Sequence, residues 1–264
     1  MTSDKEEMES MTTHFFKELY TAYSGVQADA ILEKVSPQIS QAMNEKLCKE
    51  YSDIEIGDAL FHTGPLKALG KYRFPARFFQ RHWGVFREDI TTAVKELFRS
   101  TKMPDGINDT VIVLIPKNKN PVCLRDFRPI SLCNVIYKVV SKCMVNRLRP
   151  ILQDVIAPNQ SAFIPGRQIT ENELIAFECI HSIQKSNVRK GKFCAYKLYL
   201  AKAYDRVDWG YLQGILRKLG FAEQWIGWIM ECIKTVKYSV RLNGTLLKSF
   251  TPTRGLRQGD PLSP

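Results

Sequence analysis

The chain has 264 residues, of which 44% are hydrophobic, 11% aromatic and 25% charged. This composition is typical of a folded globular protein of one or two domains, and it excludes a chain that is mostly disordered. Because no run of about 18 apolar residues occurs, no helix is expected to cross a membrane. The first ten residues carry four acids and one lysine, so they resemble neither a secretory signal nor a transit peptide.

The seven cysteines and four histidines are scattered along the sequence. No two cysteines form a Cys-x-x-Cys pair and no histidines have metal-ligand spacing, so neither a disulfide framework nor a zinc site is expected. Reduced thiols are typical of the cytoplasm and the nucleus. We therefore expect an intracellular protein in one of these two compartments.

Charge is divided unevenly along the chain. Residues 1–110 hold 14 basic and 17 acidic side chains, a net charge of −3, whereas residues 111–264 hold 24 basic and 10 acidic side chains, a net charge of +14. The basic part indicates a polyanionic partner such as nucleic acid. A basic surface without a specific partner would account for the charge equally well.

In residues 1–110 the apolar side chains recur at helical spacing. Phe15, Phe16, Leu19 and Tyr20 form one such stripe. Helices are expected from residue 12 onward, over 40–51, from a cap at Ser52 or Asp53 up to Gly64-Pro65, and twice within 76–99. A basic loop is expected at 67–75.

From residue 110 the pattern changes to strands interrupted by helices. The apolar run at 111–115 is mostly β-branched and ends at Pro116, which predicts a buried strand. Asn243 and Gly244 predict a hairpin, because Asn-Gly tolerates the positive φ angles of a type I′ turn. The other expected elements are helices at 136–152, 169–184, 209–218 and 223–232, a strand at 193–200, and hairpin strands at 238–242 and 245–250. This alternation predicts an α+β fold.

Four segments in the second part of the chain are the candidates for a functional site. They read LIPK and DFRPISL at 114–117 and 126–132, NQSAFIPGR at 159–167, KLYLAKAYDRVDW at 197–209 and RGLRQGDPLSP at 254–264. Their order and content resemble the reverse transcriptase domain of non-LTR (LINE-type) retrotransposons, particularly those of plants. The resemblance extends over nearly the whole chain.

This resemblance implies an RNA-directed DNA polymerase, which is a nucleotidyltransferase with the architecture of a right hand. Residues 1–110 would be a mainly helical region that precedes the fingers. Residues 111–264 would be the fingers and an incomplete palm of split βαβ type. The implied partners are an RNA template and a DNA primer, bound through residues 111–264, with no membrane and no small-molecule cofactor.

The resemblance also implies roles for individual residues. Lys117 and Arg128 match the fingers cations that neutralise the incoming triphosphate, although both could be ordinary surface charges. Tyr204 matches the aromatic residue that packs under the sugar and excludes a 2′-hydroxyl, or it is a plain core tyrosine. Gln258 and Gly259 match the loop that lies against the nascent base pair, where glycine permits close approach of the backbone. Alternatively, Gln258 and Gly259 form a simple turn that contacts no nucleic acid.

The segment 159–167 resembles one that contacts the template. Within it, Arg167 could hold a phosphate. An ordinary surface charge is an equally good explanation of this arginine.

Two departures from the family pattern affect catalysis. Polymerases of this kind use two Mg²⁺ ions held by carboxylates, and the palm position that would carry the first carboxylate is Tyr199, a poor magnesium ligand. Asp205 could replace it, but a structural role for Asp205 is more in keeping with the pattern. The Ala-Asp-Asp hairpin is expected beyond the last residue, Pro264, so the chain is expected to be truncated. No catalytic residue and no metal site of the family would then be intact.

Two functions from different classes follow. The chain is expected to be a catalytically inactive fragment of a reverse transcriptase, because loss of the metals removes the main stabilisation of the transition state. The alternative is a nucleic-acid-binding module that keeps contact with template or RNA through the basic part. A third possibility is an inactive remnant that does not fold.

Overall fold

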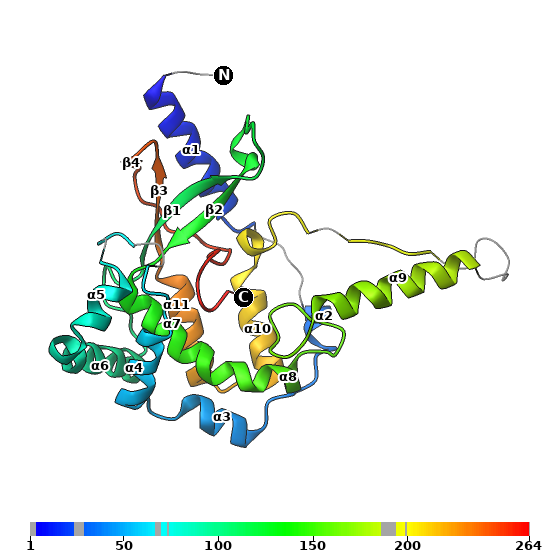
Figure 1. Cartoon of the computed structure of the whole chain (residues 1–264), viewed down its shortest axis with the longest axis horizontal. Helices are drawn as coiled ribbons and strands as arrows, with labels where there is room; N and C mark the ends of the chain where they lie inside the picture. The colour runs from blue at the N-terminus through cyan, green and yellow to red at the C-terminus, as the bar shows by residue number, and fades with distance from the viewer. Residues whose placement is uncertain are drawn as a thin grey trace.

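A computed structural model describes residues 4–23, 29–66, 70–72, 74–185, 194–198 and 200–263 (Figure 1). Helices predominate, and one mixed sheet of four strands lies beside them. The mixed content of helix and strand expected from the sequence is therefore confirmed. Within the described residues no helix is both long and apolar enough to span a bilayer.

The N-terminal part is helical, and α4 begins after the expected cap at Ser52. The first helix, expected from residue 12 onward, begins earlier, because Asp4 caps it and it starts at Lys5. The Ser52 hydroxyl accepts a hydrogen bond from the Glu55 amide at 3.3 Å, and the Glu55 carboxylate accepts one from the Ser52 amide at 2.9 Å, which is a capping box. The helices are α1 (Lys5–Leu19), α2 (Asp29–Leu32), α3 (Gln41–Cys48), α4 (Asp53–Phe61), α5 (Ala76–Arg81) and α6 (Trp83–Ser100).

The second part alternates between strands and helices. The strands are β1 (Asp109–Pro116), β2 (Phe127–Leu132), β3 (Lys237–Leu242) and β4 (Thr245–Leu246). The α-helices are α7 (Val135–Leu148), α8 (Leu152–Val155), α9 (Ile169–Lys185), α10 (Trp209–Leu219) and α11 (Glu223–Lys234). Short 3₁₀ turns cover Leu124–Asp126, Arg149–Ile151 and Tyr204–Arg206.

The strand order in the sheet is β2-β1-β3-β4. β1 pairs with β2 in the antiparallel direction and with β3 in the parallel direction, with Ile112 opposite Val240. Asn243 and Gly244 join β3 to β4 with φ angles of +47° and +86°, as the Asn-Gly turn requires. The hairpin is confirmed, although β4 is shorter than the expected strand and continues only as an isolated bridge between Tyr238 and Phe250.

Helix α1 packs on one face of this sheet. The side chains of Phe16 and of the C-cap residue Tyr20, each 1% exposed, contact a cluster of buried strand residues that includes Ile112, Tyr238 and Val240. The rings of Tyr20 and Tyr238 lie 4.9 Å apart. Burial of these rings fixes α1 against the strands from which the loops of the site emerge.

The larger hydrophobic core lies below the sheet and joins distant parts of the chain. Helices α3, α4 and α6 contribute Leu47, Ile56 and Val94, while α7 and α11 contribute Val140 and Trp225. All five side chains are fully buried. The helices before the sheet therefore share one core with the helices that follow it.

Two expectations about strands differ from the structure. The strand expected at 193–200 is not present at 194–198 and 200, where Tyr196 and Leu198 are 83% and 74% exposed; Phe193 and Tyr199 lie outside the described residues. A strand forms by pairing, and no described strand lies next to this segment. Conversely, β2 was not expected. It contains Pro129, which is tolerated because β2 is an edge strand of the sheet.

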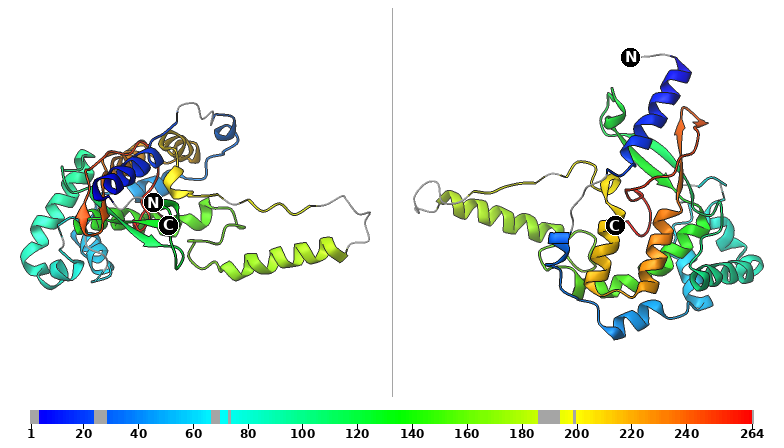
Figure 2. Two further views of the ribbon diagram at one scale, coloured as in Figure 1. Left: turned by 90° about the horizontal axis from the view of Figure 1, so that it is seen from above. Right: turned by 180° about the vertical axis from the view of Figure 1, so that it is seen from behind.

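Helix α9 extends away from the rest of the chain in each view (Figures 1 and 2). None of its residues is buried, and its exposed apolar side chains include Leu174 and Phe177 at 66% and 70%. The expected helix at 136–152 is divided by the 3₁₀ turn at Arg149–Ile151 into α7 and α8.

Arg147 on α7 joins the later helices to α3 and α4. Its Nε donates to Glu55 Oε1 at 2.8 Å, and its guanidinium lies 3.5 Å from the centre of the Tyr51 ring. The same group donates to the backbone carbonyls of Leu47, Lys49 and Glu50. One half-buried cation thus satisfies the C-terminal carbonyls of α3 and the cap of α4 together.

We predict that Arg147→Ala lowers the free energy of unfolding by about 2–3 kcal/mol, because several carbonyls and a carboxylate lose their shared donor. Chemical denaturation in urea measures the change. Arg99→Ala is the matched control, since Arg99 also pairs with a glutamate but its side chain is 81% exposed; a change below about 0.5 kcal/mol is expected there. Equal effects in the two variants would contradict the role given to Arg147.

Candidate functional site

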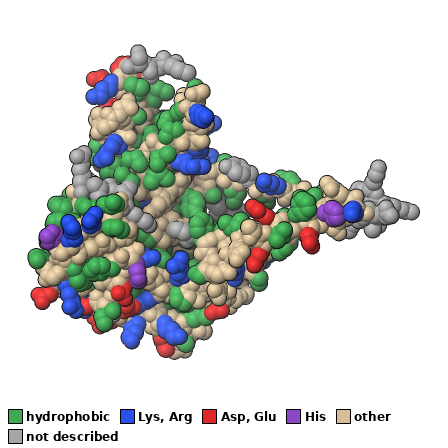
Figure 3. All heavy atoms as spheres, in the orientation of Figure 1, with side chains coloured by type: hydrophobic (Ala, Val, Ile, Leu, Met, Phe, Trp, Pro, Cys, Tyr) green, Lys and Arg blue, Asp and Glu red, His purple; other side chains and the backbone are tan. Residues whose placement is uncertain are grey.

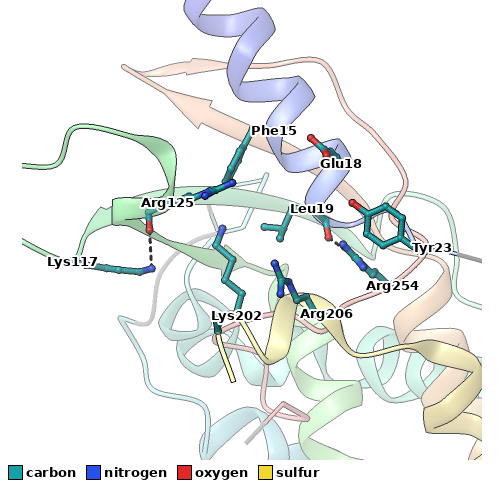
Figure 4. Close-up of a pocket in the computed structure, with 10 residues that line it drawn as sticks. Phe15, Glu18, Leu19, Tyr23, Lys117, Arg125, Lys202, Arg206 and Arg254 are labelled. Atoms are coloured by element: carbon teal, nitrogen blue, oxygen red, sulfur yellow. Dashed lines mark hydrogen bonds between the residues drawn. The ribbon is translucent and has the colours of Figure 1, made fainter. Parts of the chain in front are cut away.

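A basic pocket opens between α1 and the loop that joins β1 to β2. Its volume is about 460 Å³, and its lining contains five Lys or Arg side chains and one carboxylate. Its lining residues are Phe15, Glu18, Leu19, Tyr23, Lys117, Arg125, Ala201, Lys202, Arg206 and Arg254. In Figure 4 the charged ends of Lys117, from the loop after β1, and of Lys202 and Arg206, from one later segment, point into the same space.

The loop after β1 positions Lys117 and Arg125. Pro116 ends β1, and the Lys117 amide then donates to the Asp126 carbonyl at 2.8 Å, while Lys117 Nζ donates to the Arg125 carbonyl at 2.8 Å. The Asp126 carboxylate accepts the amides of Val122 and Cys123 at 2.9 and 3.0 Å. These backbone hydrogen bonds lower the pKa of Asp126. The loop is held by its own contacts before any ligand arrives.

Lys202 is the unusual cation of the pocket. Its Nζ is buried without a hydrogen-bond partner among the described residues, and it lies 4.6 Å from the centre of the Phe15 ring. Burial lowers the pKa of Lys202, the charge of Asp205 opposes this, and the nearby charges of Lys117, Arg125 and Arg206 lower it further. Its backbone has a φ angle of +55°, which residues other than glycine rarely adopt. A buried ammonium group with unused donors is suited to an anion that enters the pocket.

The opposite wall is held by Arg254. Its Nε donates to the Leu19 carbonyl at 2.9 Å, at the C-terminus of α1, and its guanidinium lies 4.7 Å from the centre of the Tyr23 ring. A cation at a helix C-terminus is favourably placed with respect to the helix dipole. Arg254 therefore fixes α1 to the pocket while its remaining donors stay available.

Asp205 lies beneath the pocket with an exposure of 0%. Its Oδ1 accepts hydrogen bonds from the Tyr20 hydroxyl at 3.0 Å and from Gln258 Nε2 at 3.2 Å. Burial raises the pKa of Asp205, and the hydrogen bond from Tyr20 and the charge of Lys202 oppose that rise. The carboxylate connects α1, the 3₁₀ turn Tyr204–Arg206 and the segment that carries Gln258.

The segments 204–209 and 254–258 lie side by side through further hydrogen bonds. The Leu256 amide donates to the Tyr204 carbonyl at 2.7 Å, and the Gly255 amide donates to the Val207 carbonyl at 2.8 Å. Gly255 has a φ angle of +88°, and a Cβ atom there would lie 2.6 Å from the Asp205 carbonyl oxygen. Only glycine permits this approach. The third and fourth sequence segments therefore form one structural unit.

The turn at Gln258 and Gly259 lies against the edge strand β2. The Ser131 amide of β2 donates to the Gln258 carbonyl at 2.8 Å, and Gly259 adopts a φ angle of +99°. Arg257 and Asp260 flank the turn and form a buried ion pair at 2.8 Å, each 4% exposed. This pair fixes both ends of the turn.

The residues proposed from the sequence do not all meet in one place. Lys117 lines the basic pocket, and Gln258 lies in the layer beneath it. Tyr204 is half-buried and contributes its carbonyl to that layer. Gly259 lines a second pocket of about 360 Å³. Tyr199 lies outside the described residues.

The two remaining cations lie elsewhere. Arg128 is exposed on β2 opposite Ile115 and does not line the basic pocket. Arg167 donates to the backbone carbonyls of Gln153, Ile156, Ala157 and Gln160 at 2.6–3.2 Å. Its guanidinium therefore organises the loop between α8 and α9, and its contact with the template stays a prediction.

Four pocket cations were not singled out from the sequence: Arg125, Lys202, Arg206 and Arg254. Lys202, Arg206 and Arg254 lie within the third and fourth segments, so their signal was present in the motifs themselves. Arg125 had no such signal, because its position depends on the fold of the loop before β2.

Comparison with known proteins identifies the family. Residues 115–264, more than half of the chain, match the family model described as "Reverse transcriptase (RNA-dependent DNA polymerase)". The chain therefore belongs to the reverse transcriptase family.

Its relatives are named as transposon proteins. The chain is 29% identical over 262 residues to the "Transposon TX1 uncharacterized 149 kDa protein" of Xenopus laevis, covering 98% of this chain and 20% of that protein. It is 26% identical over 163 residues to the "Retrovirus-related Pol polyprotein from type-2 retrotransposable element R2DM" of Drosophila melanogaster, covering 61% and 15%. A similar polyprotein of Nasonia vitripennis, from a type-1 element R2, is 26% identical over 187 residues, covering 69% and 17%.

The chain is thus a reverse transcriptase domain of the non-LTR retrotransposon type, as its motifs indicate. It spans about a fifth or less of the length of these relatives. Residues 115–264, which match the family model, include the five Lys and Arg side chains that line the basic pocket.

The raised pKa of Asp205 predicts a specific pH dependence of stability. An acid with a raised folded-state pKa is stabilising at low pH, and this contribution is lost as pH rises from the ordinary carboxyl value of 3.8 through the folded pKa. The Asp205→Asn variant keeps the shape of the side chain but cannot ionise, so it serves as the reference. We therefore predict that the unfolding free energy of the wild type, relative to Asp205→Asn, falls as pH rises from acid to neutral. Urea unfolding across this range measures it; a constant difference would contradict the assignment.

Proposed function

We propose that this chain is the nucleotide- and template-binding part of an RNA-directed DNA polymerase, in which the basic pocket holds the phosphates of an incoming nucleoside triphosphate. The family membership provides the reaction class. The observation that carries the proposal is the convergence of five cations on one pocket, with the buried Lys202 Nζ lacking a partner among the described residues.

The pocket is chemically suited to phosphate oxygens. Lysine and arginine form charge-assisted hydrogen bonds to phosphate, and these are about twice as strong as neutral ones. Lys117 and Arg125 belong to the loop after β1, whereas Lys202 and Arg206 belong to the third sequence segment. The pKa of Lys202 is lowered by burial and, to a smaller extent, by neighbouring cations, and a triphosphate between the two groups would offset both effects.

Reverse transcriptases generally depend on Mg²⁺, and the two carboxylates that follow the expected palm position, Asp205 and Asp208, do not fit a pair of such ions. Asp205 is fully buried beneath Tyr20 and Gln258, and the Asp208 side chain accepts the Tyr211 amide at 2.7 Å as the cap of α10. The family position for the first carboxylate is occupied by Tyr199. We therefore propose that this chain binds substrates without catalysing their polymerisation.

Further parts of the proposal follow from the same family pattern. Residues 111–264 correspond to fingers and palm, preceded by the region 1–110, and Arg128, Tyr204, Gln258, Gly259 and Arg167 contact nucleotide or template. RNA template and DNA primer are the proposed partners. All seven cysteines are described and unpaired, which supports location in the cytoplasm or nucleus.

The alternative function is a nucleic-acid-binding module that has kept template contact without chemistry. The net charge of +14 in residues 111–264 favours it. The two functions differ in their need for a nucleoside triphosphate: the module requires only a basic surface, whereas the polymerase requires the pocket.

We predict that Lys202→Met weakens binding of inorganic tripolyphosphate and of dTTP by about 10-fold or more, because one charge-assisted contact is lost. Isothermal titration calorimetry measures the affinities. Lys46→Met, at an exposed position of α3, is the matched control and should bind as the wild type does. An anion in the pocket also favours the charged form of Lys202, so wild-type binding at alkaline pH should take up a proton and the variant should not. Unchanged affinity in Lys202→Met would refute the pocket as a phosphate site.

We predict no primer extension above background with Mg²⁺ or Mn²⁺, together with nucleic-acid binding that weakens steeply as salt rises. A primer-extension assay and a fluorescence binding titration at several salt concentrations measure the two properties. Extension above background would overturn the proposed inactivity. Binding that is absent, or insensitive to salt, would overturn both the substrate-binding role and the alternative module.

A further inference from the structure

Helix α1 lies outside residues 115–264 that match the family model, yet it forms one wall of the basic pocket. Two contacts join it to the third sequence segment. The hydroxyl of its C-cap residue Tyr20 donates to Asp205 at 3.0 Å, and the Phe15 ring lies beneath the ammonium group of Lys202. In Figure 3 hydrophobic side chains and Lys or Arg side chains lie next to one another over α1, β1 and β2. The first contact is a hydrogen bond to a buried acid, whereas the second joins a cation to a ring.

The Phe15 ring is held in place by the cluster that docks α1 on the sheet. It packs edge to face on Phe16, with ring centres 5.1 Å apart, and Phe16 is buried among the strand residues of that cluster. Phe15 itself is half-buried and lines the pocket. A ring fixed in this way presents one face to the pocket at a constant place.

The ammonium group of Lys202 depends on this ring more than the other cations depend on any one contact. Its Nζ lies 4.6 Å from the centre of the Phe15 ring, within the range of a cation–π contact, and it has no hydrogen-bond partner among the described residues. The charge of Asp205 attracts it without a hydrogen bond. Lys117 and Arg254, by contrast, each donate to a backbone carbonyl. Figure 4 shows the Lys202 side chain extended toward the Phe15 ring.

A ring holds an ammonium group without occupying its hydrogen-bond donors. The group carries three N–H donors, and its attraction to a ring face is electrostatic. A carboxylate in place of the ring would hold Lys202 more tightly, but it would also take up the charge-assisted hydrogen bonds that a phosphate needs. With four further cations in the lining, the arrangement suits an anion that meets Lys202 from the side opposite the ring.

We propose that Phe15 is a positioning residue for the phosphates of the incoming nucleotide, because its ring holds Lys202 Nζ where a phosphate oxygen can reach it. This inference rests on the proposed phosphate site. The cations of the pocket then come from the part of the chain that matches the family model, and the support for one of them comes from α1. Phe15 acts on affinity through Lys202 and not by touching the ligand.

Calorimetric titration of the full chain with inorganic tripolyphosphate and with dTTP tests this role. Phe15→Leu removes the ring face but keeps an apolar side chain, and it should weaken both ligands by the same factor, about 2- to 30-fold. Phe15→Tyr keeps the ring face at a half-buried position and should bind as the wild type does. Phe86→Leu, at a half-buried phenylalanine of α6 that does not line the pocket, is the matched control and should also bind normally.

A double-mutant cycle separates positioning from a merely structural role. In the Lys202→Met background, Phe15→Leu should cause no further loss of affinity, because the group that the ring positions is absent. A ring that only supported α1 would have the same effect on affinity with or without Lys202. Phe15→Met is a second variant without the ring and should behave as Phe15→Leu does. Thermal melting of each variant confirms that the fold is retained.

The outcomes separate this inference from the function of the pocket. Normal binding by Lys202→Met would overturn the phosphate site and the role of Phe15 together. If Lys202→Met loses affinity, the role of Phe15 alone is overturned by normal binding in both variants without the ring, by an undiminished effect of Phe15→Leu in the Lys202→Met background, or by an equal loss in Phe15→Tyr. A loss for dTTP but not for tripolyphosphate would also overturn it, since the ring would then contact the base or the sugar.

Discussion

The buried Asp205 carboxylate is the contact on which the basic pocket depends. It accepts hydrogen bonds from Tyr20 of α1 and from Gln258 of the C-terminal segment, so three parts of the chain meet at one oxygen atom. Gly255 allows these segments to approach closely enough for the contact. A buried charge is costly unless it is well paired. The position of α1, and with it one wall of the pocket, follows from that requirement.

In the basic pocket, the described hydrogen bonds of Lys117 and Arg254 go to neutral carbonyl oxygens, which leaves their charge available to a ligand. Lys202 lies over the Phe15 ring and within reach of the Asp205 charge. Acidic side chains would have stabilised these cations more strongly, but they would have competed with an anionic ligand. Burial, together with the neighbouring cations, lowers the pKa of Lys202.

The sequence predicted those elements that depend on residues close together in the chain. The cap at Ser52, the β-branched run of β1 and the turn at Asn243-Gly244 are present as expected. Features that depend on distant partners were not predictable. The edge strand β2 carries Pro129 and forms because β1 pairs with it, and the segment 194–198 has a strand pattern without a described partner. The motifs included Lys202, but its burial depends on Phe15, far away in the sequence.

The parallel pairing of β1 with β3 has a consequence for how the molecule forms. Asp109 pairs with Lys237, so the central ladder of the sheet closes a loop that contains nearly half of the chain. Pairing over such a sequence separation is slow, because loop-closure entropy is lost before the contacts are gained. During synthesis, α1 has no complete surface on which to dock until the ribosome has released β3.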